Sequence, residues 1–274
     1  DVAPSRGLGD VYKRQILKGT ITSDVTLAAG NTYKLSGEYI VEEGATLHIE
    51  EGVKIIAVYD DIADYILVKQ GGKINAVGTP DKPIVMTSEK EEPGAWGGIH
   101  ICGRAHTNAE GGKGSSEIGG AVYGGNDDAD NSGTLQYIRL EYTGFAFDEE
   151  HEANGISFYG VGNGTIVDHC QAYKGSDDGF EFFGGSVNVS NLVAVSCSDD
   201  SFDWTEGWNG KGTNLVAYQE AESTLGYDCD CLMECDNNGS NNAATPVAHP
   251  VLKNLILVGN GGSKQGIRLR AGTE

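Results

Sequence analysis

The feature of this sequence that most limits its fold is an internal repeat of about 22 residues. NLVAV at 191–195 returns as NLVAY at 214–218 and as NLILV at 254–258, and DDGFEFF at 177–183 returns as DDSFDW at 199–204. A unit this short cannot bury its own apolar face, so consecutive units must stack as coils around a shared core. The repeat therefore predicts a solenoid.

Six segments align with this repeat and share a two-residue alternation: GGIHI from Gly97, NGISF from Asn154, DGFEF from Asp178, DSFDW from Asp200, LMEC from Leu232 and QGIRL from Gln265. Because successive side chains of a strand point to opposite faces, we expect two inward columns and one outward column. The inward columns are Ile99, Ile156, Phe180, Phe202, Met233, Ile267 and Ile101, Phe158, Phe182, Trp204, Cys235, Leu269. The outward column is His100, Ser157, Glu181, Asp203, Glu234, Arg268.

Short strands, glycine or Asp-Asp corners and coils of about 22 residues are typical of an all-β, right-handed parallel β-helix. The blades of a β-propeller would need about 40 residues each, and 41 glycines in 274 residues favour a turn-rich all-β chain. We predict a single β-helix domain over 16–274, in which 37–55 and 66–88 form less regular entry coils. The polar, Gly- and Asp-rich segment 105–132 is predicted to be a long loop that leaves the solenoid.

Both ends of the sequence look artificial. There is no initiator Met, and DVYKRQ at 10–15 resembles the in-frame translation of a sequencing adapter, so 1–15 is interpreted as an artefact or a disordered arm. The sequence stops at Glu274 directly after a strand-like segment, which predicts a truncated fragment.

The charge balance narrows the possible partners. The 40 acidic residues outnumber the 19 basic residues and give a formal net charge of −21. Nucleic acid is excluded as a partner, because its recognition needs clustered Lys and Arg to neutralise phosphates. No apolar run approaches the roughly 18 residues of a transmembrane segment. Cations and glycans remain as the ligand classes that this composition favours.

Several motifs carry a family resemblance. They are GTPDKPIVMTS, PGAWGGIHICG, YGGNDDADNSGTLQYIRLEYTG, NGISFYGVGNGT and DDGFEFFGG. With them, the run from Gly37 to Glu274 resembles a group of secreted right-handed parallel β-helix proteins of Bacteroidota and marine bacteria, which have a pectate-lyase-like fold. The resemblance implies a secreted or outer-cell-surface location and supplies no reaction.

The corners between strands carry an unusual density of carboxylates. Adjacent coils lie about 4.8 Å apart, so we expect Asp177 and Asp178 to stack on Asp199 and Asp200. Two like charges at that spacing repel by roughly 3.5 kcal/mol at an effective dielectric constant of 20. A bound hard cation relieves this repulsion, and carboxylate and backbone oxygens suit Ca²⁺. These four residues are the predicted calcium ligands; the alternative is that they are solvated Asp residues of sharp turns.

The outward column predicts a ligand-binding face. Its residues Glu181, Asp203 and Glu234 are expected to stack on one another. Trp208 is a candidate to stack on a sugar ring, and the alternative is that it packs in the core. We expect an exported or cell-surface acidic scaffold that Ca²⁺ stabilises and that binds a polysaccharide or cell-surface glycan.

The alternative function is a polysaccharide-cleaving enzyme. A lyase resembling the pectate type would combine Asp-bound Ca²⁺ with a basic residue that abstracts a proton, and a glycoside hydrolase would need two carboxylates as acid and base. The candidate catalytic residues are Asp178, Asp200, Lys211 and Arg268. The Gly-His-Gly motif of polygalacturonase-like enzymes is absent from the sequence.

Six cysteines permit disulfides in an exported protein. Cys170 and Cys235 fall in apolar columns and are predicted to be core residues, whereas Cys197, Cys229 and Cys231 are the better disulfide candidates. A zinc site built from Cys229, Cys231 and Cys235 is a further alternative, although it lacks the usual ligand spacing.

Overall fold

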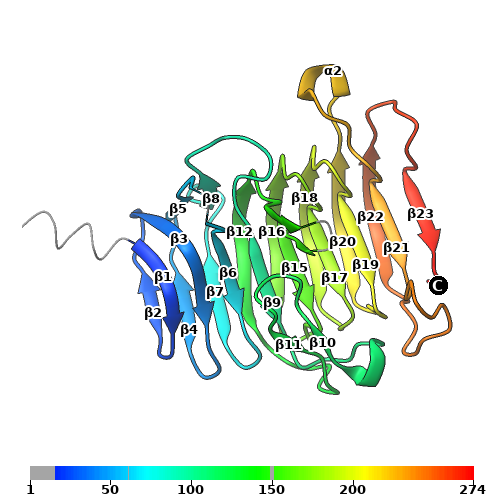
Figure 1. The fold of residues 1–274 in the computed structure, drawn as a ribbon, viewed down its shortest axis with the longest axis horizontal. Coiled ribbons are helices and arrows are strands. Elements are labelled where there is room, and N and C mark those ends of the chain that lie inside the picture. Colours follow the sequence, from blue (N-terminus) through cyan, green and yellow to red (C-terminus); the bar gives the residue numbers. More distant parts are fainter. Residues whose placement is uncertain (1–15, 61, 149–150) are drawn as a thin grey trace, which may run out of the picture.

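The computed structural model describes residues 16–60, 62–148 and 151–274 (Figure 1). Within them, 19 strands join in one sheet that winds as a row of stacked coils, and neighbouring coils pair in parallel. The prediction of an all-β, right-handed parallel β-helix is confirmed. The segment 1–15, interpreted above as an artefact or arm, lies outside the described residues.

The coils have faces of stacked strands, of which face A carries the outward column. Face A comprises the second half of β3 (Thr32–Val41) with β1 (Ile16–Ile21), β6 (Tyr65–Val68), β9 (Ile99–Cys102), β15 (Ile156–Tyr159), β17 (Phe180–Phe183), β19 (Phe202–Thr205), β21 (Met233–Asp236) and β23 (Ile267–Arg270). The first coils have two further faces, formed by β2 (Val25–Leu27), β4 (Thr46–Ile49) and β7 (Lys73–Val77), and by β3 with β5 (Lys54–Ala57) and β8 (Ile84–Ser88). These two faces merge into one long, bent strand per coil: β12 (Gly133–Glu141), β16 (Ile166–Tyr173), β18 (Asn188–Val195), β20 (Lys211–Tyr218) and β22 (Val251–Val258).

The repeated Asn of the NLVAV motifs makes the bend in these long strands. Asn191, Asn214 and Asn254 have φ of 54°, 58° and 59°, in the left-handed region that Asn tolerates better than most residues. Their side chains form a ladder, because Asn254 donates to Asn214 at 2.9 Å and Asn214 donates to Asn191 at 2.8 Å. The repeat found in the sequence is therefore a repeated corner.

The predicted register of face A is confirmed. The inward residues from β9 to β21, such as Phe180 and Phe202, pair in register and are buried. The rings of Phe158 and Phe182 stack with centroids 5.0 Å apart. Ile267 and Leu269 hold the expected positions but are 48% and 71% exposed, since no described strand stacks on the far side of β23.

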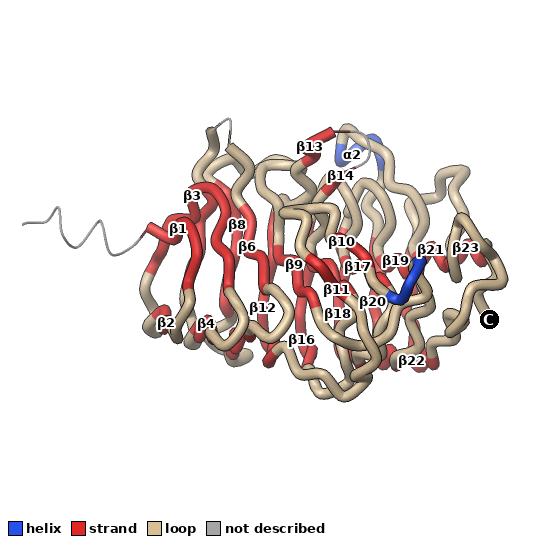
Figure 2. The backbone as a smooth tube through the Cα atoms, turned by 60° about the horizontal axis from the view of Figure 1, so that its bottom comes forward, coloured by secondary structure: helices blue, strands red, loops and turns tan. Residues whose placement is uncertain are grey.

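The coil length is less regular than the sequence suggests. Phe180 pairs with Phe202, a step of 22 residues, but Ile99 pairs with Ile156, a step of 57. The additional residues lie in insertions that leave the strand stack unchanged (Figure 2). They include the hairpin of β13 (Ala146–Asp148) and β14 (His151–Glu152). The short helix α2 (Glu222–Leu225) belongs to a separate insertion between β20 and β21.

The segment 105–132 is an insertion after β9, but it does not project away from the solenoid as predicted. It contains the 3-10 turn η1 (Glu110–Gly112) and the strands β10 (Gly114–Ser115) and β11 (Val122–Tyr123), which pair as a hairpin. Ile118 and Tyr123 are buried against the outer side of face A, next to Tyr159 and Phe183. Apolar residues within the polar segment drive this folding back, and we call 105–132 the covering insertion.

Two expectations about buried groups need correction. Trp208 is 1% exposed, stacks on Phe182 with centroids 4.1 Å apart and donates its indole N–H to the carbonyl of Val187 at 3.2 Å, so its ring is not available to a sugar. All six cysteines are buried free thiols, including the disulfide candidates Cys197, Cys229 and Cys231. Packing therefore accounts for these side chains.

Candidate acidic site

The Asp-Asp corners before β17 and β19 form a side-chain ladder along the solenoid. Asp178 Oδ1 accepts the backbone N–H of Asp200 at 2.8 Å, and Asp200 Oδ1 accepts that of Cys231 at 2.5 Å. The N–H of Asp178 in turn donates to Asn154 Oδ1 at 3.2 Å. Each carboxylate thus fixes the next coil with one oxygen and keeps its second oxygen for another partner.

Next to this ladder lies a depression of about 410 Å³, which we call the acidic trough. It runs along face A, across the corners and first outward positions of successive coils. Ten carboxylates and one guanidinium line it: Glu117, Glu152, Asp177, Asp178, Glu181, Asp199, Asp200, Asp203, Asp230, Glu234 and Arg268. So many carboxylates in one depression require protons or cations to offset their repulsion.

Two carboxylate clusters share Asp178. Asp177, Asp178 and Asp199 each offer an oxygen within 4.8 Å of the others, and so do Asp178, Glu181 and Asp203. Asp177 and Asp178 are buried, and Asp203 Oδ1 is a buried oxygen without a hydrogen-bond partner among the described residues. The two clusters are therefore oxygen-only sites of the kind that Ca²⁺ prefers.

Burial and mutual repulsion raise the pKa values of these groups. Burial and then the charges of Glu152 and Asp199 raise the pKa of Asp177 to about 8. For Asp200, burial followed by Asp199 and Glu234 raises the pKa to about 7. Burial is also the largest reason why the pKa values of Asp178, Glu181 and Asp203 lie well above their usual range. Without a cation, the trough holds protons at neutral pH.

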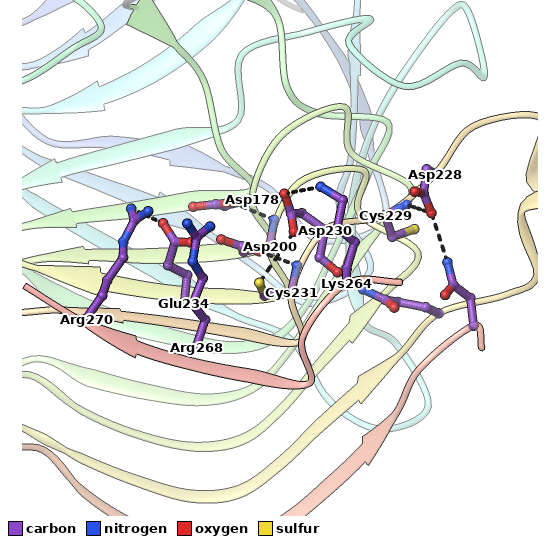
Figure 3. A network of polar contacts seen from close by, with 12 residues as sticks. Asp178, Asp200, Asp228, Cys229, Asp230, Cys231, Glu234, Lys264, Arg268 and Arg270 are labelled. Atoms are coloured by element: carbon purple, nitrogen blue, oxygen red, sulfur yellow. Dashed lines mark hydrogen bonds and ion pairs between the residues drawn. The ribbon is translucent and has the colours of Figure 1, made fainter. Parts of the chain in front are cut away.

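The far end of the trough carries its own cations (Figure 3). Arg268 on β23 contacts Glu234 at 2.9 Å, while Arg270 pairs with both Glu234 and Asp236. Lys264 contacts Asp230 at 2.8 Å. A third cluster, Asp200, Cys231 and Glu234, lies beside these pairs and includes a thiol. Its neighbouring guanidinium groups make it a poorer cation site than the two clusters around Asp178.

A comparison with family models matches residues 19–274 to the pectate-lyase-like β-helix domain. The chain belongs to this family. No curated protein matches the sequence. No helix among the described residues is long and apolar enough to cross a membrane. Membership in the pectate-lyase-like family fits a role connected with polysaccharides.

In this pectate-lyase-like domain, most of the predicted site residues come together. The four predicted calcium ligands, and Glu181, Asp203 and Glu234, all line the trough. Of the candidate catalytic residues, Asp178, Asp200 and Arg268 line it, but Arg268 is held in an ion pair. Lys211 begins β20, which belongs to the long bent strands and not to face A, so it does not belong to the site.

Three trough residues escaped the sequence reasoning. Glu117 comes from the covering insertion, Glu152 from the β13–β14 hairpin, and Asp230 from the turn before β21. None of them occupies a repeated position, so the periodicity gave no signal for them. Burial raises the pKa of Glu117 to about 7, while its Oε2 accepts the Tyr159 hydroxyl at 3.2 Å.

Proposed function

We propose that this protein is an exported or cell-surface β-helix that holds Ca²⁺ in its acidic trough and uses the site to bind a polysaccharide or glycan. The observation that carries the proposal is the pair of oxygen-only clusters around Asp178. Burial and then mutual repulsion raise the pKa values of Asp177 and Asp178, and a doubly charged cation there would offset the repulsion. Membership in the pectate-lyase-like family supports the polysaccharide.

We assign the Ca²⁺ ligands from the carboxylate oxygens that other hydrogen bonds leave available. Asp178 would give Ca²⁺ the oxygen that does not bind the Asp200 amide, and Asp177 and Asp199 would complete one side. The second cluster would hold its cation with Asp178, Glu181 and Asp203, whose Oδ1 has no hydrogen-bond partner among the described residues. A Ca²⁺ held this way keeps coordination positions for hydroxyl oxygens of a sugar, because Ca²⁺ takes six to eight ligands.

Binding is favoured over cleavage by the surroundings of the basic residues. A lyase needs a base beside the bound sugar, and the guanidinium of Arg268 already contacts Glu234. Lys211 lies on another strand stack. We therefore keep polysaccharide cleavage as the alternative function and glycan binding as the proposal.

The test has two parts. Calorimetric titration should show Ca²⁺ binding to the protein in chelator-treated buffer, and Asp178→Asn should weaken it at least tenfold. A glycan array with and without Ca²⁺ should give Ca²⁺-dependent binding. Lys211→Gln is the matched control and should behave as the unmodified protein. Release of unsaturated or reducing sugar ends from a polysaccharide panel would overturn the binding-only assignment in favour of the enzyme.

A further inference from the structure

The outward column of face A changes character along the solenoid. From β17 to β21 it consists of Glu181, Asp203 and Glu234 in the trough. The two preceding positions, His100 and Ser157, pair in the same register but are 0% exposed. The trough therefore stops between Ser157 and Glu181.

The covering insertion reaches the trough at that point through Glu117 and packs beside it, on the last outward positions of β15 and β17. Tyr123 packs on Tyr159 with ring centroids 5.1 Å apart, and Tyr159 stacks on Phe183 at 4.4 Å. Glu117 marks the boundary, since it lines the trough and accepts the hydroxyl of Tyr159.

The covering insertion is also fastened to a later coil. Glu206, which follows β19, accepts the hydroxyl of Tyr123 at 2.8 Å and that of Thr107 at 2.7 Å. Both donors belong to the covering insertion, so its two ends are tied to the same carboxylate. A ligand that entered the trough along the solenoid would meet a wall that is packed and hydrogen-bonded.

We propose that the trough receives the end of a glycan chain and not its middle. This inference rests on the proposed function, because it names which part of the polysaccharide occupies the same site. A chain that crosses a binding site needs an exit at both ends, and the wall at the buried Ser157 and at Glu117, which Tyr159 holds by a hydrogen bond, removes one of them. Hydroxyl groups of the terminal sugar would lie against the Asp178 clusters, and the rest of the chain would extend toward Arg268.

The experiment uses the unmodified protein with saturating Ca²⁺ and four probes: hexasaccharides of β-1,4-xylan, β-1,3-glucan, β-1,4-mannan and chitin. Each is prepared uncapped, with a bulky group on the reducing end, on the non-reducing end, or on both. We expect the doubly capped form of the bound glycan to lose at least tenfold in affinity, while one singly capped form binds as the uncapped chain does. Equal affinity for uncapped and doubly capped chains would overturn end recognition and leave glycan binding intact. If no probe binds although Ca²⁺ titrates, glycan binding itself is wrong and end recognition falls with it.

A variant with a shortened covering insertion tests the role of the wall directly. Replacing residues 114–123 by a short Gly-Ser turn removes the wall, and this variant should bind the doubly capped chain at least tenfold better than the unmodified protein does. Circular dichroism and a cooperative melting transition establish that it is folded. A folded variant that still rejects the doubly capped chain would contradict the assignment of the wall, and the capped chains on the unmodified protein decide the question if the variant does not fold.

Discussion

Face A has a covered half and an open half, and they show how one strand stack serves two purposes. In the covered half, the outward side of Tyr159 and Phe183 packs under the covering insertion and forms a second apolar cluster. In the open half, the matching positions are the half-buried Thr205 and Asp236, which pairs with Arg270, and the neighbouring column is carboxylate-rich. The backbone register is continuous across the boundary. Outward side chains and insertions, and not the coil geometry, decide what each part of the solenoid does.

The largest expected effect is a loss of stability in the covered half. Tyr159→Ala removes a fully buried ring that stacks on Phe183 and should lower the free energy of unfolding by about 3–5 kcal/mol, as measured by urea denaturation. Thr205→Ala lies in the same column in the open half and should cost about 1 kcal/mol or less. Equal costs at the two positions would mean that the covering insertion does not form a second core.

Calcium should act on the open half alone. Ca²⁺ at a hundredfold excess over its dissociation constant should stabilise the protein by about 2.7 kcal/mol, because it binds the folded state. The double variant Asp178→Asn, Asp200→Asn keeps acceptor oxygens for the two backbone bonds and removes two charges. It should lose most of the calcium response while keeping much of its metal-free stability.

The measurement is the melting temperature in low-salt buffer, with Ca²⁺ or with chelator. A melting temperature of the unmodified protein that responds to neither would leave the Asp corners as hydrogen-bonded turns. A calcium response that survives in the double variant would move the cation to another part of the molecule.

The pH dependence of metal-free stability should reveal the protons held by the trough. The pKa of Asp177 rises from 3.8 to about 8 in the folded protein, so between these values the folded state binds more protons than the unfolded chain. Stability should therefore fall as the pH rises from about 4 to about 8, by up to about 1.4 kcal/mol per pH unit for each such proton. Denaturation in chelator at several pH values measures the slope. Asp177→Asn should flatten it, and an unchanged slope in that variant would assign the protons elsewhere.

The smallest effect concerns the cationic end of the open half. Arg268→Gln removes a positive charge from the lining of the trough that repels Ca²⁺, and should tighten Ca²⁺ binding by about twofold to fivefold in a titration. Lys211→Gln, outside the trough, should leave the affinity unchanged. Weaker Ca²⁺ binding in Arg268→Gln would show that the guanidinium supports the site instead of repelling the cation.

The sequence repeat explains why residues of the open half could be placed from the sequence alone. Glu181 and Asp203 could be placed on one column because strand alternation and coil stacking are local rules that repeat. Glu117 and Glu152 could not be placed, since each comes from an insertion whose path depends on what it packs against. The wrong expectation for Trp208 has the same origin: it lies in the turn after β19, outside the aligned strands, and folds back into the core.

The covered half was hidden for a related reason. The segment 105–132 is polar on average, which favours a projecting loop, but Ile118 and Tyr123 are enough to attach it to face A. Composition averages over a segment, whereas docking depends on individual side chains that find a partner surface. No rule applied to the sequence alone identifies that partner.

The ladder of Asp178 and Asp200 has an evolutionary consequence. Each Asp binds the amide that opens the next coil, so a corner brings with it the means to attach its successor. Duplication of a gene segment encoding one coil would insert a further Asp-Asp corner without disturbing the corners on either side. The number of repeated coils would then set the length of the acidic trough and hence the size of the ligand that it accommodates.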